Sequence, residues 1–287
     1  MRTWLAGYDL RPVETLEAAL RILAAERGVW TPFAGGTDLM VLMEAGKLPR
    51  KKYLSIWNLA ELRGVHVNED EVVLGALATY TDLLADPTLQ AEFPLVCAAA
   101  RETGAVAIQN RGTIGGNIAN ASPAADLPPA LLVHDAVVTV ASIRGERRIP
   151  YEHFHKGYKV MDLAADELIT AVTLPRRRSG WVQTYRKVGT RRAQAISKVC
   201  FAAAASLANG TIDDLRIALG SVAPTVVRCR KTEQALRGSA RGDQHVLRLA
   251  RKTLGEEIAP IDDIRSNARY RRLVAGNLLE EFVREAS

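Results

Sequence analysis

TIGGNIANASPAAD, residues 113–126, is the most unusual stretch of this chain and lies inside the longer run QNRGTIGGNIANASPAADLPP of residues 109–129. Its adjacent glycines, Gly115 and Gly116, can adopt positive φ angles and carry no Cβ, so neighbouring backbone N–H groups can converge on an anion. The alternative is that the polar side chains after them, such as Asn120 and Ser122, cap turns and the start of a helix. The stretch predicts a turn-rich, anion-binding loop.

A second diglycine loop, AGGTD at residues 34–38, precedes the apolar run at residues 39–43. One Gly-Gly pair is usually just a tight turn, but two such loops indicate a ligand with two anionic groups or one pyrophosphate held from both sides. The hydroxyls of Thr37 and Thr113 can add donors. The chain contains neither GxGxxG nor GxxxxGK followed by Ser or Thr, which excludes the Rossmann fingerprint and the P-loop.

The chain divides into three parts. Leucines at helical spacing predict a helix over residues 13–26, and strands at 30–34 and 53–57 complete a small α/β unit. The middle part has two expected hairpins (64–67 with 71–77, 136–143 with 147–149), helices at 81–84 and 95–103, and a strand at 168–174. RRRSG, residues 176–180, looks like an exposed linker. The last part is α+β, with strands at 182–188, 199–207 and 215–221 and helices at 232–236, 245–254 and 267–284.

The charge is unevenly distributed over these parts. The 287 residues include 38 Lys and Arg against 32 Asp and Glu, a net charge of +6. Residues 1–175 hold 16 basic and 21 acidic residues (net −5), and residues 176–287 hold 22 and 11 (net +11). Few aromatic residues interleave with the basic ones, so nucleic-acid binding is disfavoured. We expect the basic surface to remain free and to dock acidic partner subunits.

Several classes of protein and site are excluded. The 48% apolar, 24% charged composition is ordinary for a globular protein, and no apolar run is long enough for a membrane span. The start of the chain shows no signal-peptide pattern, and three scattered cysteines fit a reducing compartment, so we expect a cytoplasmic protein. His153 and His155 lack a third nearby metal ligand. No nucleophile motif or carboxylate pair stands out, so we expect no catalytic or metal-binding residue and a chemistry supplied by a cofactor.

Four segments resemble the FAD-binding medium subunit of the molybdenum hydroxylases, the xanthine dehydrogenase and carbon monoxide dehydrogenase type. They are AGGTDL (34–39), RGTIGGNIANASPAADLPPALL (111–132), DELITAVTLP (166–175) and YRKVGTRRAQAISKV (185–199). SNARYRRLVAGNLL (266–279) resembles the family's C-terminal flavoprotein domain. The resemblance implies an α+β protein with a vanillyl-alcohol-oxidase-type (PCMH-like) FAD-binding fold. Its two α/β subdomains would span residues 1–57 and 58–175, and a C-terminal α+β domain residues 176–287.

The resemblance also implies site residues. The pyrophosphate loop would comprise Pro32, Phe33, Ala34, Gly35, Gly36, Thr37, Asp38 and Leu39. The second phosphate loop would comprise Thr113, Ile114, Gly115, Gly116 and Asn117. Asp126 would bind the ribose side, with Asn120 nearby, as carboxylates do in other dinucleotide sites. Ile169, through its backbone, and Lys187 would lie beside the isoalloxazine, where a cation stabilises the anion formed on reduction.

The implied activity is electron transfer. A large subunit with a molybdenum–pterin cofactor would oxidise the substrate, and a small subunit with two [2Fe–2S] clusters would deliver electrons to this FAD, which passes them to NAD⁺, a quinone or another acceptor. A dimer of heterotrimers is the implied assembly. Two alternatives remain open: a scaffold subunit with weak or lost FAD, and a free-standing FAD-dependent oxidase of the vanillyl-alcohol-oxidase type. Benzoyl-CoA-type reductases of this group carry a cysteine-bearing insertion that this chain lacks. The sequence does not identify the substrate.

Overall fold

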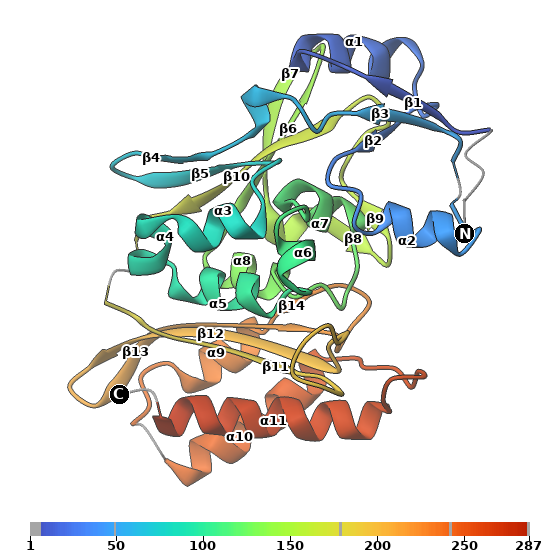
Figure 1. Cartoon of the computed structure of the whole chain (residues 1–287). Helices are drawn as coiled ribbons and strands as arrows, with labels where there is room; N and C mark the ends of the chain where they lie inside the picture. The colour runs from blue at the N-terminus through green and yellow to red at the C-terminus, as the bar shows by residue number, and fades with distance from the viewer. Residues whose placement is uncertain (1–6, 49, 178–179, 241–242, 286–287) are drawn as a thin grey trace.

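The computed structural model describes residues 7–48, 50–177, 180–240 and 243–285. Three β-sheets follow one another along the chain and are stacked from the N-terminal unit to the C-terminal helices (Figure 1). Each expected range holds one of these sheets, because their strands lie between residues 9–55, 65–175 and 182–228. The mixed α+β architecture matches the expected fold class.

The first unit is a parallel sheet with two helices. Its strand order is β1 (Asp9–Pro12), β3 (Lys52–Ser55), β2 (Thr31–Phe33). The predicted first helix is α1 (Leu16–Ala25), and it begins where the Thr15 hydroxyl accepts a hydrogen bond from the Ala18 amide. Helix α2 (Leu39–Glu44) differs from α1 because it buries none of its residues, although five of the six are apolar.

The second unit is an antiparallel five-stranded sheet with helices on one side and a small hairpin. The sheet order is β4 (Val65–Val67), β5 (Glu71–Gly75), β10 (Leu168–Pro175), β6 (Val137–Ser142), β7 (Gly145–Pro150). The helices are α3 (Tyr80–Ala85), α4 (Pro87–Glu92), α5 (Pro94–Glu102), α6 (Val106–Gln109), α7 (Ile114–Asn120) and α8 (Pro128–Val133). The hairpin pairs β8 (His155–Gly157) with β9 (Val160–Met161), and the 3-10 turns are Ala60–Leu62 and Tyr151–His153. The predicted hairpins and helices of this part are thus present.

Helix α7 corrects the expectation of a turn-rich loop at TIGGN. Thr113 caps it, because the Thr113 hydroxyl accepts a 3.1 Å hydrogen bond from the Gly116 amide. Gly115 is required by packing, since a Cβ there would lie 2.9 Å from the Ala76 carbonyl oxygen. Ala121, with a φ of 47°, ends the helix in the left-handed conformation. The diglycine pair therefore forms the first turn of a short helix.

The third unit is a four-stranded antiparallel sheet covered on both faces. Its strands are β11 (Val182–Val188), β12 (Val199–Ala208), β13 (Thr211–Gly220) and β14 (Val227–Arg228), and its helices are α9 (Arg230–Leu236), α10 (Gln244–Glu257) and α11 (Ala268–Glu285). Alternate residues of β12 face opposite sides. Phe201 and Ala203 belong to the core under the C-terminal helices, whereas Ala202 and Ala204 belong to the core of the second unit.

Arg177 and Gly180 are exposed and lie outside helices and strands, as expected of the linker at residues 176–180, and Arg176 alone departs from that expectation among the linker residues described. Arg176, placed in the linker, forms a two-bond ion pair with Glu92 at 2.6 and 2.8 Å, while Arg178 and Ser179 lie outside the described residues. Acidic neighbours hold some arginines of residues 176–287, but most of the described arginines and lysines there are exposed, so the free basic surface stays a prediction. The ion pairs include Arg228 with Glu233, Arg230 with Glu152, Arg251 with Glu280 and Arg271 with Asp263. Within the described ranges, no helix is long and apolar enough to cross a bilayer.

Candidate functional site

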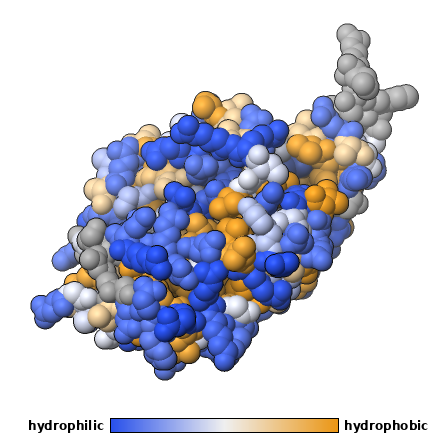
Figure 2. Space-filling model, turned by 90° about the horizontal axis from the view of Figure 1, so that it is seen from below, coloured by the Kyte–Doolittle hydropathy of each residue, from blue (hydrophilic) through white to orange (hydrophobic). Residues whose placement is uncertain are grey.

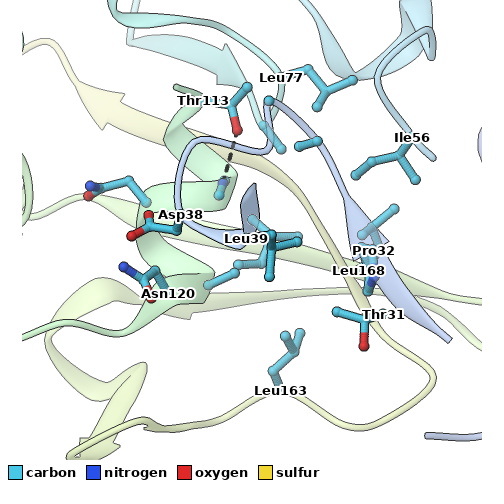
Figure 3. A pocket seen from close by; sticks show the side chains of 18 of the residues that line it. Thr31, Pro32, Asp38, Leu39, Ile56, Leu77, Thr113, Asn120, Leu163 and Leu168 are labelled. Atoms are coloured by element: carbon cyan, nitrogen blue, oxygen red, sulfur yellow. Dashed lines mark hydrogen bonds between the residues drawn. The ribbon is translucent and has the colours of Figure 1, made fainter. Parts of the chain in front are cut away.

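A cavity of about 520 Å³ lies between the first and second units. Its walls come from the first diglycine loop, the start of α7, the β8–β9 hairpin and the start of β10 (Figure 3). The size is within the range of small-molecule and cofactor sites. Because its walls are far apart in the sequence, the cavity depends on the packing of the two units against each other.

The AGGTD loop carries the free backbone donors of this site. Among the described residues, no acceptor is found for the amide N–H groups of residues 34–38. Gly36 has a φ of 77°, and a Cβ on Gly35 would lie 1.7 Å from the Arg111 carbonyl oxygen. The two glycines let this loop turn and lie directly against the segment before α7. Unpaired amides facing a cavity are suited to phosphate oxygens.

The TIGGN segment does not offer such donors, which corrects the expectation of two equivalent backbone nests. The Ile114 amide donates to the Ala78 carbonyl, the Gly115 amide to the Ala76 carbonyl and the Asn117 amide to the Thr113 carbonyl. The Gly116 amide is held by the Thr113 hydroxyl, as the dashed line in Figure 3 shows. Side chains remain for a ligand: the Thr113 hydroxyl can donate its proton, and the buried Asn117 Oδ1 lacks a partner within the described chain.

One end of the cavity is apolar. Pro32, Ile56, Leu77 and Leu168 surround it, and Figure 3 shows these side chains on the side away from Asp38. Ile169 lines the same cavity at the point where the pairing of β10 with β6 becomes irregular. Such walls fit a flat ring system, because both of its faces can contact aliphatic carbon.

The other end is polar and charged. Asp38 and Asn120 face each other across it (Figure 3). The ammonium of Lys159 donates to Asn120 Oδ1 at 2.6 Å and also to the Asn120 carbonyl. Burial raises the pKa of the Asp38 carboxyl, and nearby Lys159 opposes that shift. These three residues join the first loop, the end of α7 and the β8–β9 hairpin.

The hairpin holds the C-terminal end of α7 through a second side chain. His155 Nε2 lies 2.9 Å from the Ile118 carbonyl in the last turn of α7, and this carbonyl also accepts from the Ala121 amide. Burial lowers the pKa of this histidine. A neutral ring that donates from Nε2 therefore fits this position, and His155 acts as a structural contact to α7.

Asp126 and Lys187 are not on the cavity wall. Lys187 Nζ donates to Asp126 Oδ2 at 2.7 Å and to the Glu102 carbonyl at 2.8 Å, and Tyr185 donates to the Asp126 carbonyl. Packing of β11 against α5 brings Lys187 to this position. Burial raises the pKa of Asp126 to about 6, with Lys187 opposing the shift. Their assignments to ribose and isoalloxazine remain predictions from the resemblance.

The cavity brings together most of the predicted residues. Lining it are Pro32, Ala34, Gly35, Gly36, Thr37, Asp38, Leu39, Thr113, Gly115, Gly116, Asn117, Asn120 and Ile169. Phe33 supports the loop from behind, because a Cβ on Gly36 would lie 2.7 Å from its ring, and Ile114 is fully buried in the core. Sequence reasoning missed Tyr80, Lys159 and Leu168. Leu168 adjoins the predicted Ile169, whereas no local pattern distinguishes Tyr80 or Lys159.

The site resembles no metal centre, since the described residues contain no group of three His, Cys, Asp or Glu side chains able to hold an ion. Residues 8–177 match the family described as the FAD binding domain in molybdopterin dehydrogenase. Residues 183–286 match the CO dehydrogenase flavoprotein C-terminal domain. Together these matches cover nearly the whole chain.

Similar proteins span the same length. The xanthine dehydrogenase FAD-binding subunit of Escherichia coli O157:H7 is 32% identical over 274 residues, with 95% of this chain and 93% of that protein covered. The glyceraldehyde dehydrogenase medium chain of Sulfolobus acidocaldarius is 32% identical, with 96% of each covered. Among solved structures, carbon monoxide dehydrogenase from Hydrogenophaga pseudoflava superposes with a TM-score of 0.92 at 27% identity, covering 97% of this chain and 96% of that one.

Proposed function

Since this chain belongs to the FAD-binding medium subunits of molybdopterin dehydrogenases, the xanthine and carbon monoxide dehydrogenase type, we propose that it binds FAD in the described cavity and serves as an electron-transfer subunit. The observation that carries the assignment of the cavity is the AGGTD loop, whose amides at residues 34–38 have no acceptor within the described chain. The oxygens of the two phosphate groups of FAD would accept hydrogen bonds from these amides.

Different residues of the cavity would bind different parts of FAD. The first loop would hold the pyrophosphate, with the Thr113 hydroxyl as a further donor on the opposite wall. The unpartnered Asn117 Oδ1 would accept a hydrogen bond from a hydroxyl of FAD. Pro32, Ile56, Leu77 and Leu168 would enclose a ring and exclude water from it. Bound FAD supplies reversible electron transfer, which fits a chain in which we identify no catalytic residue.

We propose that electrons arrive from a small partner with two [2Fe–2S] clusters and leave to NAD⁺, a quinone or another acceptor. A large subunit with a molybdenum–pterin cofactor would select the substrate, in a dimer of heterotrimers. Relatives named for xanthine and for glyceraldehyde are equally similar to this chain, at 32% identity, so similarity does not favour either substrate. We further propose a cytoplasmic location, because Cys97, Cys200 and Cys229 are free, buried thiols.

Flavin content tests the proposal directly. The purified chain, or its complex with partner subunits, is expected to show the flavin absorption bands or to gain them on titration with FAD, at one FAD per chain. A chain that carries no flavin and binds none when FAD is added would refute the proposal and favour a scaffold subunit. Acid precipitation distinguishes a further alternative: we expect FAD in the supernatant, whereas flavin retained in the pellet would indicate the covalent attachment typical of free-standing oxidases.

A further inference from the structure

Tyr80 is a buried phenol on the cavity wall, and its hydroxyl has no protein partner. The residue is 2% exposed and lines the cavity. Within the parts of the chain that the structure describes, no hydrogen bond of this hydroxyl is found. The oxygen is not sealed inside the protein either, unlike the unpartnered Trp30 Nε1 and Asn117 Oδ1. Because a buried Tyr hydroxyl usually has a hydrogen-bond partner, we expect the partner of this one in the cavity.

The backbone around Tyr80 holds the ring in place. Tyr80 is the first residue of α3, and Thr79 before it caps the helix in a reciprocal pair with Asp82. The Tyr80 amide donates to the Gly112 carbonyl at 3.3 Å, and Thr79 pairs with Thr113 in an isolated β-bridge. A Cβ on Gly112 would lie 2.8 Å from Cε2 of the Tyr80 ring. The phenol is therefore fixed against the start of α7 before any ligand binds.

Two carboxylates lie close to the phenol. Burial raises the pKa of Tyr80, and Asp126 and Asp38 raise it further because they repel a phenolate. Tyr80 therefore lies between the polar end of the cavity, at Asp38, and the Asp126–Lys187 pair, and its hydroxyl keeps its proton as a hydrogen-bond donor. The phosphates of FAD are assigned to the first loop, and the carboxylates disfavour a further anion here. The expected acceptor is an uncharged atom of the ligand.

We infer that Tyr80 is a cofactor-binding residue whose hydroxyl donates a hydrogen bond to a carbonyl oxygen of the isoalloxazine. The inference rests on the proposed function. Of the two ring systems of FAD, only the isoalloxazine carries carbonyl oxygens, and a phenol O–H pairs well with such an acceptor. Reduction increases the electron density on these oxygens, so the hydrogen bond is stronger in the reduced state. Tyr80 therefore raises the midpoint potential of bound FAD.

Tyr80→Phe tests the inference, because it removes one oxygen and leaves the ring against Gly112. The affinity for reduced FAD should fall about two- to tenfold more than the affinity for oxidised FAD, as expected for one hydrogen bond. The midpoint potential then falls by about 10–30 mV, since a tenfold change is about 30 mV for two electrons. The infrared carbonyl bands of bound FAD should move to higher frequency, because the hydrogen bond weakens the C=O bond.

Stability without FAD gives an independent measurement. The FAD-free Tyr80→Phe variant should melt no lower than the FAD-free wild type, because its hydroxyl has no protein partner to lose. Tyr185→Phe is the contrasting variant, since Tyr185 donates to the Asp126 carbonyl at 3.0 Å, and it should melt lower. Tyr270→Phe is the neutral control. Tyr270 is 39% exposed on α11 of the third unit, on the mainly hydrophilic side of the molecule seen in Figure 2.

The outcomes separate this inference from the proposed function. A wild-type chain that binds no FAD refutes the function. With FAD bound, a wild-type potential and unshifted carbonyl bands in Tyr80→Phe refute the inference alone. Weaker FAD binding with both of these unchanged also refutes it, since the hydroxyl would then contact another part of FAD. A lower melting temperature of the FAD-free Tyr80→Phe variant, as in Tyr185→Phe, refutes it too, because it would show a protein partner for the hydroxyl.

Discussion

Lys187 of β11 and Asp126, which follows α7 in the chain, form a buried ion pair with an Nζ–Oδ2 distance of 2.7 Å. The pair is one of several bonds between the third unit and the segment after α7. The Ser221 amide donates to the Pro123 carbonyl, and the Ser197 hydroxyl donates to the Ala124 carbonyl. The segment after α7 therefore lies next to the cavity at its start, and at residues 123–126 it forms contacts between the FAD-binding part and the C-terminal domain.

Lys187→Met should destabilise the chain in a pH-dependent way. Removing one partner of a buried pair costs about 3–5 kcal/mol, and we expect this loss at pH 8, where Asp126 is ionised. The pKa of Asp126 is raised to about 6, above its usual value of about 3.9, so its contribution to stability is full below about pH 4 and is lost as the pH rises through 6. Denaturation of the variant at pH 5 should therefore show a smaller loss than at pH 8.

The same variant tests the assignment of Lys187 to the flavin. If the ammonium acts on the isoalloxazine, Lys187→Met lowers the midpoint potential of bound FAD, with modest loss of binding. Adding Asp126→Asn should recover most of the stability without restoring the potential. A wild-type potential in Lys187→Met would show that the lysine serves only to join the two domains.

Gly35→Ala should abolish FAD retention. The added Cβ would lie 1.7 Å from the Arg111 carbonyl oxygen, so the first loop must move away from the segment before α7 and its amides lose their positions. Gly255→Ala is the control, because nothing lies within 4 Å of a Cβ there, and an alanine in α10 should be neutral or slightly stabilising. Titration with FAD, followed by flavin fluorescence, measures both. Wild-type affinity in Gly35→Ala would mean that the loop does not hold the phosphates.

Thr113→Ala should weaken FAD binding because the threonine caps α7 and presents its hydroxyl to the cavity. Loss of the cap alone costs about 1 kcal/mol of stability and frees the Gly116 amide. Thr113→Ser keeps the hydroxyl and should restore both the melting temperature and the dissociation constant. Rescue of stability without rescue of binding would argue against a direct contact between Thr113 and FAD.

Acidification should release FAD through His155. Burial lowers the pKa of His155, so the stability it contributes is present above its ordinary pKa of about 6.5 and is lost as the pH falls below that value. His155→Gln retains a donor for the Ile118 carbonyl without the titration. We expect the variant to keep FAD to lower pH than the wild type. Identical release profiles would assign acid release to another group, such as Asp38.

The elements with clear periodicity could be predicted from the sequence. Helix α1 and strands β11 and β12 follow the expected ranges closely, whereas β13 begins at Thr211, four residues before the expected start. Helix α1 buries one apolar face, and β12 is apolar over most of its length because both of its faces are buried. Helix α7 could not be predicted, since two glycines and two asparagines disfavour a helix and its stability comes from the Thr113 cap and the contact with Ala76.

The site residues could be predicted from the sequence only in segments of unusual composition, such as the diglycine loops. The two diglycine motifs correctly predicted two segments that line the cavity. They could not show which backbone amides lack an acceptor, because the acceptors of the Ile114 and Gly115 amides are the carbonyls of Ala78 and Ala76, far away in the sequence. Lys159 lies in an ordinary segment, and its role arises from the position of the hairpin beside Asn120. The resemblance assigned Asp126 to the ribose and Lys187 to the isoalloxazine, and the bond between the two side chains is one that no spacing rule predicts.

Strand β12 determines how the chain must unfold. Ala202 and Ala204 pack into the core of the second unit, while Phe201 and Ala203 pack into the core under the C-terminal helices. Both hydrophobic cores therefore include this one strand. The family boundary between residues 177 and 183 therefore does not separate two cooperative units. Excising residues 183–286 would uncover α5 and α8, so neither fragment should persist as a soluble monomer. The intact chain should melt in one calorimetric transition.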